Sequence, residues 1–309
     1  MAMAGLLLAA GTAVTQTALA ATPPAPASGP LPVSYDFLAN AVRYGDAQNA
    51  PGENNWACRP SAAHPEPVVL VPGTAGDDAD NWGTYAALLY DNGYCVYALT
   101  YGVPPALAST PLQFGGLNTI ESSAGQLSTF VARVIRASGA HKVDLVGHSQ
   151  GTLMPDYYVK FLGGSRYVDK YISLAPLWHG EGQAQSDAEM WQFASLLGVG
   201  NSSELPICQA CTEMVGGSAF LDKLTAGGLA VAGVHYTNIV TEHDELVMPY
   251  TSGIESGMTN IVLQDGCPTD LSDHLEIASD QRASVLVLDA LDPTHPFVVP
   301  CHVVLPAVG

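Results

Sequence analysis

The stretch that most limits the fold of this chain is residues 143–151, VDLVGHSQG. An apolar run of strand character leads into Ser149, which glycines flank on both sides, and the helix-like run TLMPDYYVKFLG follows at once. Glycine is needed at both flanking positions because a tight strand-to-helix turn packs backbone against backbone and leaves no room for a Cβ atom. We therefore expect Ser149 at the apex of the turn, in a strained conformation with its hydroxyl clear of the sheet.

Other apolar or β-branched runs have the composition of buried strands; together with the first they lie at residues 68–71, 95–101, 143–146, 171–174, 235–240 and 260–263. Helix-like segments separate the first four, at 82–92, 120–138 and 157–162, and another follows at 284–291. In 120–138 the apolar residues recur with a period of 3.6, and Gly139 stands where a helix ends. This alternation predicts a single α/β domain, whose mostly parallel sheet has helices on both faces.

The charge balance excludes several classes of partner. The 309 residues include 29 Asp and Glu against 10 Lys and Arg, for a formal net charge of −19. Such a surface repels phosphate backbones, so nucleic acid is not expected as a partner, and anionic membranes do not attract it. Any contact with lipid has to be apolar, and no segment is expected to be an integral membrane span.

The N-terminus has the features of an export signal. Residues 3–14 form a short apolar run, and the triplet ALA before residue 21 matches a small-x-small cleavage site. We interpret 1–20 as a signal peptide of a secreted protein and 21–34 as a Pro/Ala-rich linker before a domain at 35–309. No Lys or Arg precedes the apolar run, so a plain disordered tail is the alternative.

Six cysteines, an even number, fit the disulfides of an exported protein, although six cysteines allow fifteen pairings. Cys208 and Cys211 have the CxxC spacing of a zinc half-site or a redox pair. The chain has no second CxxC and no His pair with zinc-finger spacing, which favours a local disulfide. No metal site is predicted.

A serine hydroxyl becomes a nucleophile only beside a base, and the base needs a group to orient it. With a serine at such a turn, the chain order is Ser, acid, His. His274 lies in the loop beyond the sixth apolar run, where the base of this fold lies, whereas its competitor His243 directly follows the fifth run. We therefore expect Ser149 as nucleophile and His274 as base.

The orienting acid is expected at Asp244, which follows the fifth run after a short turn. That position brings a carboxylate to the carboxyl edge of the sheet, where ligands bind in such folds. Asp265 is a weaker alternative. Asp270 and Asp273 flank His274 too closely to orient it, and we assign them to turn and helix capping.

The charge on a reacting carbonyl oxygen needs two N–H donors. One is expected from the backbone of Gln150 after the nucleophile. The other is expected from Thr74 in the loop VPGTAGDDADNW after the first strand, with the Thr74 hydroxyl as a further candidate donor.

Acidic residues in the loop after the first strand raise the possibility of a metal site. Asp77, Asp78 and Asp80 are consistent with a calcium site, but solvated acids, with Asp80 capping the next helix, are favoured. Glu242 and Glu245 are also expected to be solvated.

Apolar residues at the strand ends suggest a groove for an acyl chain, although each could be ordinary core. They are Pro104, Pro105, Leu107, Phe114, Leu153, Met154, Leu177, Trp178, Leu246 and Val247. The insertion at 180–233 is expected to be a lid or cap, or else a fixed packing segment. Its helical spacing is carried by Met190, Phe193, Ala194 and Leu197.

The motifs VPGTAG, NGYCVYALTYG, VDLVGHSQG, YISLAPLWHG, TEHDELVMPYTS and NIVLQDGCPTDLSDH, within about residues 35–293, carry a family resemblance. The chain resembles the secreted class 2 triacylglycerol lipases and esterases of actinobacteria and is similar to the yeast lipase B type. The resemblance implies an α/β-hydrolase fold with no metal or organic cofactor. By residue it implies Ser149, Asp244 and His274 as the catalytic triad, and Thr74 and Gln150 as the oxyanion donors.

The sequence departs from the family pattern at two positions. Pro72 replaces a His that is common in the actinobacterial members, and Thr152 replaces a Gly, which is expected to narrow the site. The resemblance also implies disulfides Cys58–Cys95, Cys208–Cys211 and Cys267–Cys301.

The function implied is a secreted carboxylic-ester hydrolase, a triacylglycerol lipase or esterase that works through an acyl-enzyme on an apolar ester or lipid, with a monomer as the default state. An acyltransferase or polyester depolymerase with the same triad is the main alternative. A serine peptidase and a non-catalytic hydrolase-like binding protein are further alternatives.

Overall fold

The computed structural model describes residues 29–309 except 46, 48, 106, 109–113 and 183–207. The chain divides into two units, Met1–Pro30 and Leu31–Gly309. The helices and strands given below all belong to the second unit. The expected signal peptide and most of the expected linker lie outside the described residues.

The described residues form a six-stranded sheet in the order β2-β1-β3-β4-β5-β6. Each neighbouring pair in it is parallel. The strands are β1 Val68–Val71, β2 Val96–Ala98, β3 Val143–His148, β4 Val168–Leu174, β5 His235–Val240 and β6 Thr259–Val262. The predicted α/β fold is confirmed, and each predicted strand is present within a few residues of its expected place.

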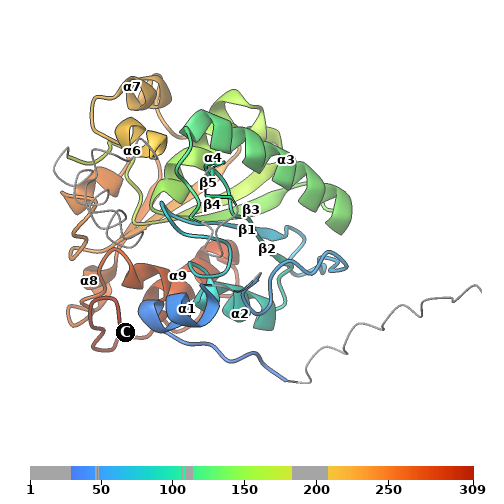
Figure 1. The fold of residues 1–309 in the computed structure, drawn as a ribbon. Coiled ribbons are helices and arrows are strands. Elements are labelled where there is room, and N and C mark those ends of the chain that lie inside the picture. The colour runs from blue at the N-terminus through green and yellow to red at the C-terminus, as the bar shows by residue number, and fades with distance from the viewer. Residues whose placement is uncertain (1–28, 46, 48, 106, 109–113, 183–207) are drawn as a thin grey trace, which may run out of the picture. The chain divides into compact units, whose positions relative to one another are not determined.

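Helices cover both faces of the sheet (Figure 1). They are α1 Phe37–Tyr44, α2 Gly83–Asp91, α3 Ile120–Ser138, α4 Gln150–Phe161, α6 Gln209–Glu213, α7 Ala219–Thr225, α8 Leu263–Gly266 and α9 Gln281–Leu291. The helices α3 and α4 lie over one face, while α2 and α9 lie over the other with α1 beside them. Alternate side chains of β1 enter the two cores, since Val69 packs with α3 and α4, and Leu70 packs with α2 and α9.

Several elements differ from the sequence prediction, and three of them lie close to the candidate site. The strand β2 ends at Ala98, and α4 begins directly at Gln150 although Pro155 lies inside it. The helix α1 was not predicted from the sequence. It is only eight residues long, which is too short for a clear apolar period, and it begins where Asp36 accepts the N–H of Ala39.

All three implied disulfides are present. They join Cys58 to Cys95, Cys208 to Cys211 and Cys267 to Cys301, with Cα–Cα distances of 5.8, 5.4 and 5.3 Å. The zinc alternative for the CxxC pair is therefore not supported, because the two sulfur atoms are bonded to each other.

The turn after β3 has the geometry that its glycines predict. Ser149 has φ 53° and ψ −125°, an unusual conformation for a residue with a side chain. A Cβ atom on Gly147 would lie 2.0 Å from the carbonyl oxygen of Gly151, and one on Gly151 would lie 2.1 Å from the carbonyl oxygen of Val71. The turn thus packs β3, α4 and the end of β1 through backbone atoms.

We expect Gly151→Ala to lower the free energy of unfolding by at least about 3 kcal/mol, because the new methyl group overlaps backbone that cannot rotate away. Gly125→Ala is the matched control. It lies in the exposed face of α3 with no atom within 4 Å of the added Cβ. It should stabilise the protein by about 0.5–1 kcal/mol. Urea unfolding measures both, and a Gly151→Ala protein as stable as the control would contradict the packing argument.

Candidate active site

Ser149 stands at the carboxyl end of β3, where α4 begins. Its backbone N–H donates to the carbonyl of Leu174 in β4 at 3.0 Å, and its own carbonyl accepts the hydroxyl of Thr152 at 2.7 Å. The serine is 5% exposed, and its neighbours in the chain are buried. The first turn of α4 directs its N–H groups toward this end of the sheet, which favours negative charge there.

His274 and Asp244 form a buried pair. Nδ1 of His274 lies 3.0 and 2.9 Å from the two carboxylate oxygens of Asp244. The same carboxylate accepts the backbone N–H groups of Leu246 and Val247 at 3.0 and 2.7 Å, so its orientation is fixed by its own loop. A carboxylate on Nδ1 leaves Nε2 as the ring nitrogen available for proton transfer. His243, the competing base, is exposed.

The backbone of His274 is held on both sides. Its N–H donates to Oε2 of Glu245 at 3.1 Å, and its carbonyl lies 2.8 Å from Nε2 of His148. Glu245 was expected to be only solvated. Although exposed, Glu245 holds the loop that contains His274 through this hydrogen bond, which joins residues 29 positions apart in the chain.

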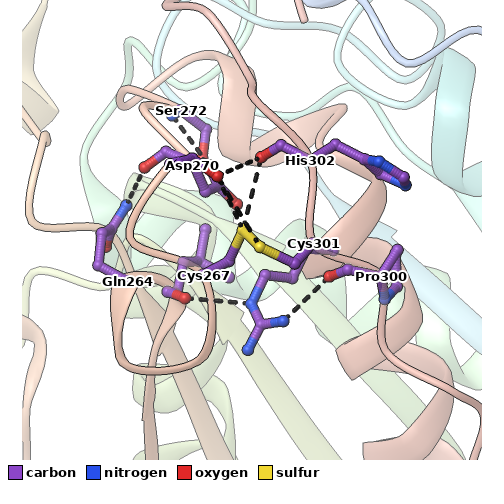
Figure 2. Close-up of a disulfide and its surroundings, with 10 residues drawn as sticks. Gln264, Cys267, Asp270, Ser272, Pro300, Cys301 and His302 are labelled. Carbon is purple, nitrogen blue, oxygen red and sulfur yellow. Dashed lines mark hydrogen bonds between the residues drawn. A yellow bond between two sulfur atoms is a disulfide. The ribbon is translucent and has the colours of Figure 1, made fainter.

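The loop before His274 has little regular structure and is fixed by side-chain bonds (Figure 2). The disulfide Cys267–Cys301 ties its start to the C-terminal tail. Nε2 of Gln264 donates to the carbonyl of Asp270 at 2.9 Å. Oδ1 of Asp270 in turn accepts the N–H and the hydroxyl of Ser272.

Two further hydrogen bonds fix this loop. The hydroxyl of Thr241, directly after β5, donates to the carbonyl of Ser272 at 2.6 Å. Asp273 accepts the N–H of Glu276. The predicted turn-capping roles of Asp270 and Asp273 are therefore confirmed, although neither caps the short helix that begins at Glu276. Asp265, the alternative acid, is exposed.

The loop after β1 lies against the start of α4. The hydroxyl of Thr74 donates to Oε1 of Gln150 at 3.1 Å. A Cβ atom on Gly116 would lie 2.5 Å from that same amide oxygen, so the backbone at Gly116 packs closely against the Thr74–Gln150 contact. The structure thus brings the two candidate oxyanion residues together and engages the Thr74 hydroxyl with the Gln150 side chain.

The acids in the loop after Thr74 are buried or half-buried and bond within the loop, which corrects the sequence prediction. Asp77 is 5% exposed, and its Oδ1 accepts the N–H groups of Ala79 and Asp80. Asp80 accepts the N–H of Asp77 in return, and the N-cap of α2, Trp82, has no side-chain cap bond. The loop folds back on itself, so its acids cap their own turn and not the helix. No cluster of His, Cys, Asp or Glu in the described residues is arranged to hold a metal ion.

A cavity of about 340 Å³ opens beside Ser149 and His274. Its walls come from α1, the loop after β1, the Cys208–Cys211 disulfide and the loops after β5 and β6. The residues are Phe37, Leu38, Ala41, Gly73, Thr74, Ala75, Gly76, Asp80, Asn81, Leu117, His148, Ser149, Cys208, Cys211, Leu246, His274 and Leu275. The surface offered to a ligand is mostly apolar and includes Ser149 and His274.

The family model for lipases of class 2 matches residues 65–285. The chain belongs to the class 2 lipase family. The matched region runs from just before β1 into α9 and contains Ser149, Asp244 and His274.

Solved structures of similar fold include Aspergillus fumigatus lipase B, with a TM-score of 0.57 and 20% identity over 81% of this chain and 61% of that one. Bacillus licheniformis lipase BlEst2 in its propeptide form has a TM-score of 0.53 and 17% identity over 75% of this chain and 51% of that one. Its mature form has a TM-score of 0.53 and 15% identity over 75% and 94% of the two chains. This chain therefore spans about half to three fifths of the first two proteins, and these likenesses establish the α/β-hydrolase fold.

The departure of this class 2 lipase at Thr152 does not narrow its site. Thr152 is fully buried, bonds back to Ser149 and does not line the cavity. Pro72 is also buried, and its carbonyl accepts the hydroxyl of Tyr101 at 2.8 Å.

Most of the predicted groove residues are corrected by the structure. Of the six taken as substrate contacts, only Leu246 lines the cavity. The others are at most 2% exposed and belong to the core on the α3–α4 side: Leu153, Met154, Leu177, Trp178 and Val247. They follow the strands in the sequence, but their side chains are buried in the core, a difference that composition does not reveal. Pro104, Pro105, Leu107 and Phe114 do not line the cavity either.

The expected lid can be followed only in part. Residues 208–233 of the insertion form α6, α7 and the turns around them. The helical set Met190, Phe193, Ala194 and Leu197 lies outside the described residues. No helix in the described part of the chain is long and apolar enough to cross a membrane.

The buried loop acids generate a pH prediction. Burial, and after it the charge of Asp77, raises the pKa of Asp80 to about 8. The ordinary value is about 3.9, so between these values the folded protein retains a proton that the unfolded chain releases. Stability should therefore fall as pH rises from about 4 to about 8.

Asp80→Asn keeps the bond to Asp77 and removes this titration. We expect urea unfolding at pH 5 and pH 8 to show a smaller loss of stability for Asp80→Asn than for the parent. Asp265→Asn, at an exposed acid, is the control and should follow the parent. Equal losses in all three proteins would show that Asp80 does not titrate as inferred.

Proposed function

We propose that this protein is a secreted serine hydrolase of carboxylic esters, a triacylglycerol lipase or esterase that acts through Ser149, Asp244 and His274. The observation that carries the proposal is the buried Asp244–His274 pair, whose histidine lines an apolar cavity together with a serine at the apex of a strained turn. Membership of the class 2 lipase family supports the same reaction. Three disulfides support export to an oxidising compartment.

In the proposed mechanism, His274 takes the proton of the Ser149 hydroxyl as its oxygen attacks the ester carbonyl carbon. Asp244 holds the ring and stabilises the imidazolium. The backbone N–H groups of Thr74 and Gln150 stabilise the negative oxygen of the tetrahedral intermediate. The carbon–oxygen bond to the alcohol then breaks, and the alcohol leaves with the proton from His274. Water repeats the sequence on the acyl-enzyme and releases the acid.

The cavity supports an uncharged ester with an apolar chain. Leucine, phenylalanine and alanine side chains make up most of its α1 side, and the strongly acidic protein disfavours anionic substrates. Acyl transfer to an alcohol would use the same residues. Product analysis with and without added alcohol separates the two reactions, and a panel of p-nitrophenyl esters and emulsified triglycerides defines the substrate.

Ser149→Ala and His274→Ala should each lower kcat for a p-nitrophenyl ester by about 10⁶-fold, because either change removes the activated nucleophile. His243→Ala is the control, since His243 is exposed, and it should leave kcat unchanged. Steady-state kinetics with a thermal melt would measure this. Activity of Ser149→Ala within tenfold of the parent would refute the nucleophile, and loss of activity only in His243→Ala would refute the base.

The α1 wall should limit the length of the apolar chain. Ala41 lines the cavity, whereas its neighbour Val42 is 86% exposed. Ala41→Phe should fill the space of two or three methylene groups, each worth about 0.8 kcal/mol. We therefore expect kcat/KM for long-chain esters to fall about 10- to 60-fold relative to the acetate, with Val42→Phe unchanged. A chain-length profile that is the same in both variants would argue against this wall.

A further inference from the structure

A chain of buried polar groups connects the loops of the candidate site. Asn81 is 3% exposed, and its Oδ1 accepts the N–H of Gly73, the residue before Thr74, at 3.1 Å. The same oxygen lies 3.1 Å from Nδ1 of His148, which is 2% exposed. Nε2 of His148 lies 2.8 Å from the carbonyl oxygen of His274. The path of contacts therefore runs from Gly73 in the loop after β1, through Asn81 and His148, to the base His274.

The contacts and the burial of His148 determine which of its ring nitrogens carries a proton. A carbonyl oxygen only accepts, so the contact with His274 requires a proton on Nε2 of His148. Burial, together with the neighbouring His274 ring, lowers the pKa of His148 to about 3. The ring is therefore neutral at ordinary pH, and its Nδ1 then carries a lone pair.

Asn81 faces two different demands as a result. The N–H of Gly73 needs the amide oxygen, whereas Nδ1 of the neutral His148 ring needs an N–H donor. Both contacts are with Oδ1, and Nδ2 of Asn81 has no partner among the described residues. In this orientation the amide satisfies the N–H of Gly73. A half-turn would satisfy the ring nitrogen instead but would set the amide N–H against the N–H of Gly73.

We propose that Asn81 and His148 are positioning residues. They hold two loops in place relative to Ser149: the loop after β1 that contains Thr74 (the oxyanion loop) and the loop beyond β6 that contains His274 (the base loop). The three groups that react come from separate segments, after β1, after β3 and beyond β6. Asp244 fixes the ring of His274 and Glu245 holds its N–H, while His148 holds its carbonyl and is itself adjacent to Ser149 in the chain. His148 therefore couples the base directly to the nucleophile turn, and Asn81 extends that coupling to the oxyanion loop.

This inference rests on the proposed function, because positioning has a meaning only for an acyl-transfer site. Its energetic basis is the steep dependence of such reactions on geometry, in which a shift of about 1 Å can cost about 100-fold in rate. Asn81 and His148 are two of the 17 residues that line the substrate cavity, so a change at either is expected to lower kcat more than it alters KM.

The test compares variants that keep or remove single links. His148→Gln retains an N–H near the place of Nε2 and so retains the bond to His274, whereas His148→Leu keeps the bulk and removes it. Asn81→Ser cuts the link to the oxyanion loop and leaves His148 in place. Each variant is assayed on a soluble p-nitrophenyl ester, and active sites are counted by titration with a fluorophosphonate, with a thermal melt alongside.

We expect kcat per titrated site to fall about 10- to 100-fold in His148→Leu and Asn81→Ser, with a smaller change in KM. His148→Gln should recover most of the loss. If His148→Leu does not fold, the contrast between His148→Gln and Asn81→Ser decides in the same way.

A purely structural role would lower the melting temperature and leave kcat per titrated site unchanged in all three, and that result would overturn the proposal. So would His148→Gln as impaired as Asn81→Ser. A parent protein that neither hydrolyses esters nor reacts with the fluorophosphonate would instead refute the proposed function itself.

Discussion

The structure depends first on the contact of bare backbone at the turn after β3. Two glycines let the start of α4 approach both β3 and the end of β1 more closely than any side chain allows, with a prospective Cβ on Gly151 only 2.1 Å from the carbonyl of Val71. This contact fixes where α4 starts, forces Ser149 to a positive φ, and places the serine beside the loop that leaves β1. The strain at one residue is tolerated because packing on every side of the turn determines its conformation.

The parallel sheet then gathers the other groups. Because each strand runs in the same direction, the residues that follow β1, β3 and β5 emerge at one edge of the sheet. Thr74, Ser149 and Asp244 each lie within a few residues of the end of their strand, so the fold alone brings them near one another. The sheet has a buried core on both faces, which makes this edge a rigid platform for loops.

What the sequence could predict follows from the range of the interactions. The strands, the long helix α3 and the serine turn are set by local period and by glycine, and these were predicted closely. Asp244 and His274 could be chosen from chain order, and the structure pairs them. The cavity wall could not be predicted, because whether Leu153 or Ala41 faces the cavity depends on how α4 and α1 rotate against the sheet. Glu245 and Asn81 were missed for the same reason, since their partners are remote in the chain.

The base is the least locally determined part of the site. His274 lies beyond β6 in a segment with little backbone pairing of its own, and single hydrogen bonds of the kind that hold it contribute only about 1 kcal/mol each. Its position is instead fixed by bonds from several elements at once, from Thr241 and Gln264 behind the loop and from Asp244, Glu245 and His148 around the residue. The Cys267–Cys301 disulfide limits how far the loop can open when one of these bonds breaks. A catalytic loop of irregular backbone can therefore be as well ordered as the sheet edge it serves, provided that its bonds converge from different directions.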